Sequence, residues 1–309
     1  MFEELVGQEP VKRKLSFYLE AYEKTGTFPF LNFIGARGLG KSKFATEFSK
    51  YVIGSNGLKK PLLAINSSSI KSGKQFFDQV FLPHINDKEV IVFFDECHAL
   101  PKDFIYSLLT ILNADKNNKV DYVAGDNVYS LDFIKHHFLF ATTESQELFI
   151  PLRDRLTAIE FADYSEDDLK KIYEKTLPEI NFDSEALELL AQTSRGNARA
   201  CVLRSNEIKM FYERYCQGIF TKQDAEKLFF ILDILPHGLN RIEWQILNIL
   251  RKNGSCSLSM LAAKTGLTRS AIQKDYELFL IRKGLINIDG VRHITNNGCK
   301  VLEMCKNSV

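Results

Sequence analysis

Short, predominantly apolar runs divide the first half of the chain. They occupy Leu31–Ile34, Leu62–Asn66, Val90–Phe94 and Phe138–Thr142. Runs of this length are typical of strands that are buried on both faces of a parallel sheet. The longer stretches between them are helical in character. We therefore expect residues 1–161 to form an α/β domain, with helices flanking a parallel sheet.

Residues 162–237 change to a purely helical pattern. Ser165-Glu166-Asp167-Asp168 and Thr221-Lys222-Gln223-Asp224 have the sequence of capped helix starts. Asp183 begins a further helix over Ser184–Ala191. A small all-helical lid domain is expected here.

Past Leu235–Gly238 the apolar positions predict three helices and then two short strands. The helices cover residues 241–252, 259–265 and 270–283, and the strands cover 285–288 and 291–294. Asp289-Gly290 fits the tight turn of a hairpin between the strands. Three helices followed by a hairpin describe a winged helix, which we expect over residues 238–309.

Length and composition agree with this division. At 309 residues, 45% apolar and 26% charged, the chain is too long for one ordinary core and has the composition of a globular protein. No apolar run approaches the roughly 18 residues that span a bilayer. Met1–Glu4 lacks the basic start of a signal peptide. We expect a cytoplasmic protein with no membrane partner.

The cysteines indicate no metal site of their own. The six cysteines, at positions 97, 201, 216, 256, 299 and 305, form no Cys-x-x-Cys pair and no Cys/His cluster with zinc spacing. We expect them to be reduced and mostly buried.

The net charge of +1 conceals an uneven distribution. Residues 241–309 carry 11 Lys and Arg against 5 Asp and Glu, which leaves 29 against 34 of the totals of 40 and 39 for residues 1–240. A basic terminal module favours an anionic partner, although a solvated basic surface has the same composition. Arg269 and Lys274, near the start of the third helix of this module, are candidates for contact with DNA phosphates or bases.

The most specific motif is Gly35-Ala36-Arg37-Gly38-Leu39-Gly40-Lys41-Ser42, which fills every fixed position of the phosphate-binding loop G-x-x-x-x-G-K-[ST]. It lies between a predicted strand and a helical stretch. Its glycines allow successive backbone N–H groups to turn around a phosphate. Lys41 would reach the β- and γ-phosphate oxygens, and Ser42 would bind Mg²⁺. The expected ligand is a nucleoside triphosphate with Mg²⁺.

A second element needed for triphosphate hydrolysis follows downstream. The run Val90–Phe94 ends in Asp95-Glu96-Cys97-His98. Asp95 would lie beside the metal at the carboxyl end of its strand, and Glu96 would orient or deprotonate the attacking water. An apolar run that ends in Asp-Glu is common by itself, but downstream of a complete phosphate loop it indicates an active site.

Three further segments carry candidate catalytic groups. Thr143 follows a strand end, where a hydroxyl can contact the γ-phosphate or position water, although Thr-Thr also serves as simple capping. Arg153 and Arg155 could reach a neighbouring subunit's γ-phosphate or form ordinary surface ion pairs. Arg199, in Arg195-Gly196-Asn197-Ala198-Arg199, is near the start of a helix that could fold over the nucleotide.

The phosphate loop, the Asp-Glu-x-His strand, the Ala-Thr-Thr strand end, Leu-Arg-Asp-Arg and Gly-x-x-Arg occur here in the order found in AAA+ ATPases. The sequence most resembles the RuvB family of Holliday-junction branch-migration motors. Leu5–Leu15 is similar to that family's Val-Gly-Gln opening, and the likeness covers nearly the whole chain. It implies an ATP-hydrolysing ring motor or helicase, hexameric on DNA, that acts in DNA recombination and repair.

The resemblance assigns the nucleotide contacts residue by residue. Val6 and Gly7 would lie beside the adenine, and Ile172 on the lid would close over it. Phosphates and Mg²⁺ would be held by Gly35, Ala36, Arg37, Gly38, Leu39, Gly40, Lys41, Ser42 and Lys43, with Asp95 as the second metal residue.

The resemblance also implies catalytic and DNA-binding roles. Thr143 would be the first sensor and Arg199 the lid sensor. Arg155 would be an arginine finger in trans, with Arg153 as the alternative, so that turnover would require assembly. Arg292 matches a basic position of the DNA-binding wing.

Three departures from the family pattern restrict this transfer. Ala36-Arg37 replaces the usual prolines, and an arginine there is familiar from bacterial clamp loaders. Lys171 stands where the family's lid carries an adenine-stacking tyrosine. Residues 121–129 form a predicted hairpin where RuvB contacts RuvA, but it is shorter and differs at its tip, so dependence on a RuvA-like partner does not carry over.

Three alternatives remain at the level of sequence. A clamp-loader-like ATPase would share the core and Arg37, but the best-known bacterial type has a zinc-binding cysteine cluster and a helical collar. A two-lobed Asp-Glu-x-His helicase would need a second ATPase lobe, for which the chain has no room. A nucleotide-dependent scaffold that recruits proteins through its winged helix would have no chemical need for Glu96.

Overall fold

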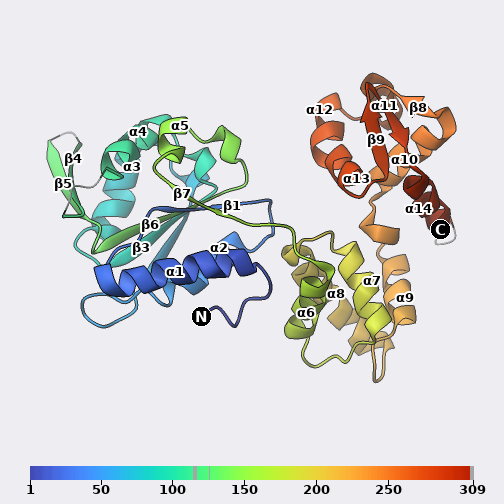
Figure 1. Ribbon diagram of the computed structural model, residues 1–309, viewed down its shortest axis with the longest axis horizontal. Coiled ribbons are helices and arrows are strands. Elements are labelled where there is room, and N and C mark those ends of the chain that lie inside the picture. The colour runs from blue at the N-terminus through green and yellow to red at the C-terminus, as the bar shows by residue number, and fades with distance from the viewer. Residues whose placement is uncertain (114–116, 125, 307–309) are drawn as a thin grey trace. The chain divides into compact units, whose positions relative to one another are not determined.

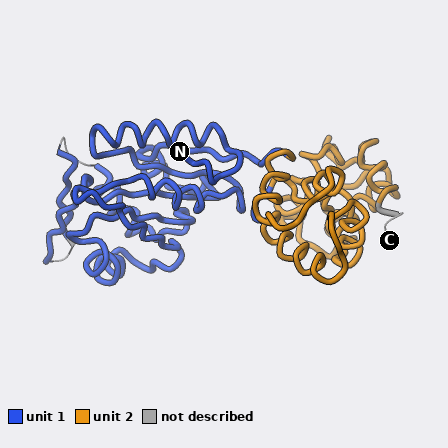
Figure 2. Tube along the Cα trace, turned by 90° about the horizontal axis from the view of Figure 1, so that it is seen from below, with its two compact units in different colours: residues 1–165, 197–199 blue, residues 166–196, 200–309 orange. Residues whose placement is uncertain are grey.

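The computed structural model describes residues 1–113, 117–124 and 126–306. The chain forms two compact units, shown in different colours in Figure 2. The first comprises residues 1–165 and 197–199, and the second comprises residues 166–196 and 200–309. The lid and winged-helix segments thus fall in one unit, and the expected boundaries at 161/162 and 237/238 stay a prediction.

A five-stranded parallel sheet forms the centre of the first unit (Figure 1). In spatial order its strands are β2 (Leu62–Asn66), β3 (Val90–Asp95), β6 (His136–Thr142), β1 (Leu31–Ile34) and β7 (Thr157–Glu160). The four strands expected from apolar runs are all present. The edge strand β7 was missed, because only one of its four residues is buried and they form no apolar run.

Helices cover both faces of this sheet (Figure 1). On one face lie α1 (Glu9–Thr25) and α2 (Lys41–Ser49), and on the other lie α3 (Gly73–Phe76), which continues into the π-helical η2 (Phe77–Ile85), and α4 (Lys102–Ile111). Successive residues of β3 therefore enter different cores. Phe94 packs with Phe104 and Phe140 on the α4 side, whereas Phe93 packs with Phe33.

The predicted hairpin before β6 is also present. β4 (Lys119–Ala124) pairs antiparallel with β5 (Asn127–Asp132), and Gly125 of the predicted turn lies outside the described residues. Tyr129 and Leu131 of β5 are buried in the same core as Phe94. The hairpin is thus anchored through one face.

The second unit begins with four helices. They are α6 (Glu166–Thr176), α7 (Ser184–Thr193), α8 (Ala198–Tyr215), whose first two residues belong to the first unit, and α9 (Lys222–Ile231). Two expected helix starts are confirmed in detail. Asp183 accepts the N–H of Ala186 at the start of α7, and Thr221 and Asp224 form a reciprocal capping box at the start of α9.

The winged helix follows in the same unit. Its helices are α10 (Arg241–Asn253), α11 (Leu258–Thr265), a continuous helix formed by α12 (Arg269–Ala271), η6 (Ile272–Glu277) and α13 (Leu278–Arg282), and α14 (Asn296–Lys306). Its sheet has the order β8 (Ser255–Cys256), β10 (Val291–Ile294) and β9 (Ile286–Asp289). The expected helices and hairpin are confirmed, whereas the two-residue β8 and α14 were not predicted.

An ion pair joins the lid and winged-helix segments within the second unit. Arg195, between α7 and α8, pairs with Glu243 of α10 at 2.5 Å, and Glu243 is fully buried. The Arg195 guanidinium carbon also lies 3.2 Å from the ring centroid of Phe279. These contacts tie the two segments together within the unit.

Burial of the cysteines agrees with the sequence-based expectation. Cys97, Cys201 and Cys256 are buried, Cys216 and Cys299 are partly buried, and all five are free thiols. The Cys305 side chain lies outside the described part of the chain. Among the described helices, none has the length and apolar composition to cross a membrane.

One buried histidine makes the stability of the first unit depend on pH. The His137 ring lies 4.4 Å from the ring of Phe28 and 5.3 Å from that of Tyr22, measured between centroids. Within the part of the chain that the structure describes, its Nε2 atom has no hydrogen-bond partner. Burial, together with the charge of Lys60, lowers the pKa of His137 from 6.5 to about 3.

We predict that the free energy of unfolding falls as the pH is lowered from 6.5 towards 3. Over this range His137 binds a proton in the unfolded chain but stays neutral in the folded protein, so protonation favours unfolding. The loss from this group at pH 5 is about 2 kcal/mol. His137→Phe should remove this part of the pH dependence in urea unfolding curves. The exposed His84, changed to Gln, is the control, and parallel pH profiles for wild type and His137→Phe would contradict the prediction.

Candidate active site

The phosphate loop connects β1 to α2 at the carboxyl edge of the sheet. Gly38 and Gly40 have φ angles of 87° and 93°, in the left-handed region that favours glycine. Gly40 directly precedes α2, so the first N–H groups of this helix face the loop. The strand, loop and helix expected from the motif are therefore confirmed.

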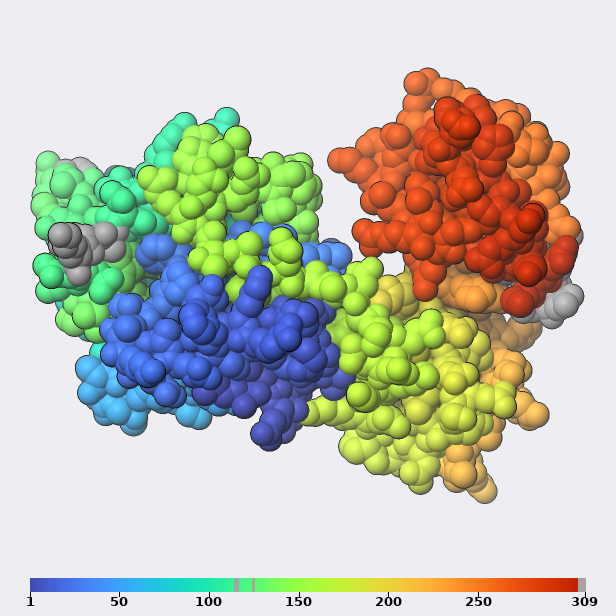
Figure 3. Space-filling model, viewed as in Figure 1, coloured from blue at the N-terminus to red at the C-terminus, as the bar shows by residue number. Residues whose placement is uncertain are grey.

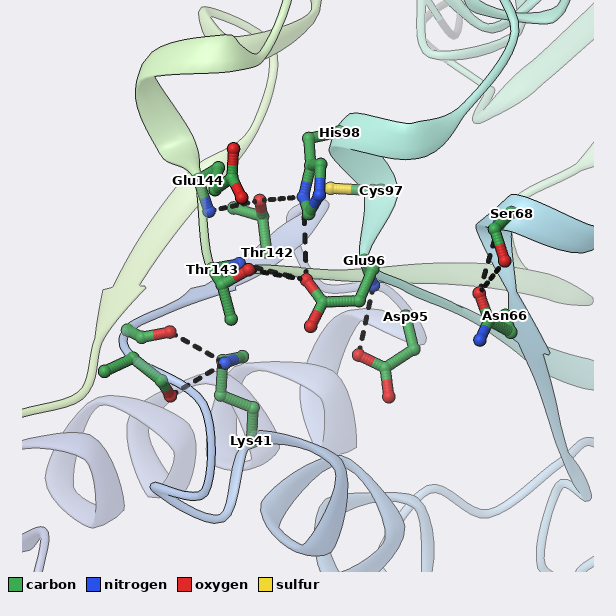
Figure 4. A network of polar contacts seen from close by, with 12 residues as sticks. Lys41, Asn66, Ser68, Asp95, Glu96, Cys97, His98, Thr142, Thr143 and Glu144 are labelled. Atoms are coloured by element: carbon green, nitrogen blue, oxygen red, sulfur yellow. Dashed lines mark hydrogen bonds and ion pairs between the residues drawn. The ribbon is translucent and has the colours of Figure 1, made fainter. Parts of the chain in front are cut away.

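Lys41 lies within the loop. Its Nζ atom donates to the carbonyl oxygens of Gly35 at 2.7 Å and Ala36 at 3.1 Å (Figure 4). Burial lowers the pKa of Lys41, the carboxylates of Glu96 and Asp95 oppose this shift, and Arg199 adds to it. The ammonium group thus lies among the charges that the sequence assigned to the site.

Ser42 and Asp95 meet as expected of a metal-binding pair. Ser42 Oγ donates to Asp95 Oδ2 at 2.8 Å, and Asp95 Oδ1 accepts the N–H of Glu96 at 3.1 Å. A hydroxyl and a carboxylate are hard oxygen donors, and they leave most of an octahedral shell to water and phosphate oxygens. The pair therefore fits Mg²⁺.

Glu96 and Thr143 are joined directly, as Figure 4 shows. Glu96 Oε2 accepts hydrogen bonds from Thr143 Oγ1 at 2.9 Å and from Thr143 N at 3.2 Å. Glu96 itself has a φ of 52°, an unfavourable left-handed conformation for a residue with a side chain. Strain of this kind is common at functional sites, where the surrounding contacts maintain it.

His98 and Thr142 support this pair, a role that sequence reasoning missed. His98 Nδ1 lies 2.9 Å from Thr142 Oγ1 and 3.5 Å from Glu96 Oε2. Thr142 Oγ1 also accepts the N–H of Glu144 at 3.0 Å. The available signal was the histidine of Asp-Glu-x-His together with the Thr-Thr doublet at a strand end.

The lid-sensor segment reaches the phosphate loop. The backbone N–H of Arg199 donates to Gly38 O at 3.2 Å, and Asn197 Nδ2 donates to Arg37 O at 2.9 Å. The Arg199 side chain is exposed. Tyr164, which follows β7, donates from its hydroxyl to Leu39 O at 3.1 Å. Neither Asn197 nor Tyr164 was among the expected site residues.

Val6 and Gly7, two of the residues expected beside the adenine, lie in the first unit next to a contact between Gln8 and Ala162. Gly7 and Gln8 have φ angles of 65° and 56°, and the Gln8 amide forms a two-point pair with Ala162, at 2.5 Å to its O and 3.2 Å from its N. Val6 is half-buried beside them in sequence. Ile172 lies on α6 in the second unit, so its closure over a base stays a prediction.

Arg153 and Arg155 have no carboxylate partner among the described residues that would neutralise their charge. Both are exposed, at the end of α5 (Ile150–Arg153) and just after it, and Figure 3 shows this yellow-green segment at the surface of the first unit. Arg155 donates to the carbonyl oxygen of Pro151 at 2.8 Å. Across the described residues, neither guanidinium forms an ion pair with a carboxylate.

The candidate DNA contacts divide into two groups. Arg269 on α12 and Lys274 on η6 are exposed. Arg292 is 8% exposed and pairs with buried Glu277 through two hydrogen bonds, of 2.7 and 3.2 Å. Its strand position faces the interior of the winged helix. The ion pair leaves little of Arg292 at the surface, and its contact with DNA stays a prediction.

Comparisons with known proteins agree with this geometry. The family model for the Holliday junction DNA helicase RuvB P-loop domain matches residues 1–161, and the model for the RuvB C-terminal winged helix domain matches residues 236–303. The Holliday junction branch migration complex subunit RuvB of Kosmotoga olearia is 27% identical over 298 residues, covering 92% of this chain and 83% of that protein. The corresponding subunit of Lactobacillus gasseri is 26% identical over 295 residues, covering 91% and 83%.

Solved structures show the same fold. The RuvB Holliday junction branch migration motor of Thermotoga maritima has a TM-score of 0.76 at 22% identity, and the match covers 96% of this chain and 95% of that one. NtrX from Brucella abortus with ATP has a TM-score of 0.56 at 16% identity, covering 89% and 69%. The expected fold class, a parallel-sheet P-loop domain with a C-terminal winged helix, is confirmed. Because the P-loop domain model alone spans more than half of the chain, this protein belongs to the RuvB family.

Proposed function

We propose that this chain is the motor subunit of a DNA branch-migration machine. In this proposal, ATP hydrolysis at subunit interfaces drives translocation on duplex DNA and migration of Holliday-type junctions. The observation that carries it is the joined Glu96–Thr143 pair beside Ser42–Asp95 at the phosphate-loop edge, in a chain that ends in a winged helix. The names of the RuvB relatives support the choice of substrate.

The residues divide the chemistry among them. Lys41 would bind the phosphate oxygens, and Ser42 and Asp95 would hold Mg²⁺, which when bound neutralises charge on the β- and γ-phosphates. Glu96 would orient the attacking water and take its proton. The two hydrogen bonds from Thr143 keep the Glu96 carboxylate directed into the site instead of into solvent.

The arginines require a second subunit. Arg153 and Arg155 are exposed and engage no carboxylate in the described chain, as expected of groups that act on a neighbour's phosphate. A head-to-tail contact of this kind closes into a ring, and the family resemblance favours six subunits. We infer that the monomer binds ATP but hydrolyses it slowly.

Glu96→Gln should bind ATPγS as wild type does and lose about 10²- to 10⁴-fold in the rate of phosphate release, because the amide cannot accept the water's proton. Calorimetry and a phosphate-release assay measure the two properties. Glu147→Gln is the control, because it makes the same change at an exposed carboxyl on the short helix that follows Thr143. Retention of wild-type turnover in Glu96→Gln would exclude its role as base.

Arg155→Ala should lose about 10³- to 10⁵-fold in turnover if it is the finger, with Arg153→Ala as the matched comparison. Arg155→Ala and Glu96→Gln, each nearly inactive by itself, should recover activity when mixed. At some interfaces an Arg155→Ala subunit then supplies the intact Glu96 and a Glu96→Gln neighbour supplies the intact Arg155. Random mixing makes about a quarter of interfaces complete. Failure of this mixture, with recovery in the Arg153→Ala mixture, would assign the finger to Arg153.

Binding of duplex DNA should weaken steeply with salt. Arg269→Gln and Lys274→Gln should each reduce the slope of log affinity against log salt by about 0.9, because each removes one phosphate contact. Fluorescence anisotropy over a series of NaCl concentrations gives the slope, and Lys300→Gln on α14 is the control. If the wild type binds no DNA at any salt, the winged helix serves a protein partner and the motor proposal fails.

A further inference from the structure

Three consecutive carbonyl groups of the phosphate loop are held from outside the loop. The contacts are Asn197 Nδ2 to Arg37 O at 2.9 Å, Arg199 N to Gly38 O at 3.2 Å, and Tyr164 Oη to Leu39 O at 3.1 Å. All of these residues belong to the first unit. The donors come from two places distant in sequence: the segment after β7 and the start of α8.

The direction of each carbonyl determines the direction of the next N–H group. In a trans peptide the C=O of one residue and the N–H of the following residue point to opposite sides. None of the described peptide bonds is cis. Holding the three carbonyls therefore also fixes the directions of the N–H groups of Gly38, Leu39 and Gly40. Successive N–H groups on one side form an anion-binding concavity.

We propose that Asn197 and Tyr164 are positioning residues that preorganise the phosphate loop for the β-phosphate of the nucleotide. The proposal rests on the ATP site of the proposed function. It gives one structural reason for the affinity of that site for nucleotides. A glycine-rich loop loses much conformational freedom on binding. Hydrogen bonds that already hold its peptide groups reduce that cost before the nucleotide arrives.

Two glycines of the phosphate loop leave room for Asn197 and Tyr164, the two supports, to approach it closely. A Cβ atom at Gly38 would lie 2.2 Å from Asn197 Oδ1, and one at Gly40 would lie 3.2 Å from Tyr164 Oη. The two glycines thus allow the supporting side chains to approach the backbone. Tyr164 is buried, and Asn197 Oδ1 accepts the N–H of Arg199 at 2.9 Å, which fixes the plane of its amide.

Two conservative substitutions test the role. Tyr164→Phe removes only the hydroxyl, and Asn197→Ser removes the amide donor while leaving an oxygen that can cap the start of α8. Tyr22→Phe is the matched control, because Tyr22 is equally buried in the same unit and donates its hydroxyl to a backbone carbonyl, that of Ile53, at 2.5 Å.

The dissociation constants of ADP and ATPγS are measured by calorimetry on the full chain, with KM and kcat for ATP. Each support variant should weaken both nucleotides by about two- to tenfold, the net worth of one hydrogen bond. The loss should fall on KM more than on kcat, since the supports act on the phosphate loop and not on Glu96. Tyr22→Phe should bind both nucleotides as wild type does.

The outcomes separate this inference from the proposed function. A wild type that binds neither nucleotide refutes the ATP site itself. Wild-type or tighter binding in Tyr164→Phe and Asn197→Ser, with normal binding in the wild type, overturns the preorganisation alone. Equal weakening in Tyr22→Phe would also overturn it, because the effect would then be a general loosening of the unit.

Discussion

The register of three parallel strands determines the geometry of the active site. Ile34 of β1 lies opposite Thr142 of β6, and Phe94 of β3 lies opposite Phe140. The residues just past these pairs therefore meet at one edge of the sheet: the phosphate loop, Asp95-Glu96 and Thr143. A shift of one residue in any strand would turn its side chains to the other face and separate these groups. The aromatic cores on both faces resist such a shift.

Polar contacts refine what the register brings together. Glu96 is in the left-handed conformation and its carboxylate accepts from Thr143, while His98 contacts both Thr142 and Glu96. Hydrogen bonds to buried or half-buried polar groups are costly to leave unmade, so each member fixes the orientation of the next. The supports of the phosphate loop follow the same logic, with Asn197 and Tyr164 acting on backbone carbonyls.

Charge alone did not distinguish the roles of the arginines. Arg292 and Arg195 are both engaged by buried carboxylates, Glu277 and Glu243. A buried pair of this kind costs much to break and orients the elements that carry it. Arg153, Arg155 and Arg269 are exposed instead, where a guanidinium remains available to a phosphate.

Local patterns in the sequence determined the central strands, the capped helices, the phosphate loop and the Asp95–Glu96 pair, because each is encoded within a few neighbouring residues. The short strands β7 and β8 were missed. Two to four residues are too few to show the apolar–polar alternation of a strand, and their pairing depends on the neighbouring strand. The contacts of Asn197 with the loop, the support from Tyr164 and the burial of Arg292 join residues far apart in the chain or depend on which face a strand turns inward. Only the tertiary structure decided these, because hydrogen-bond partners and burial are properties of packing and not of local sequence.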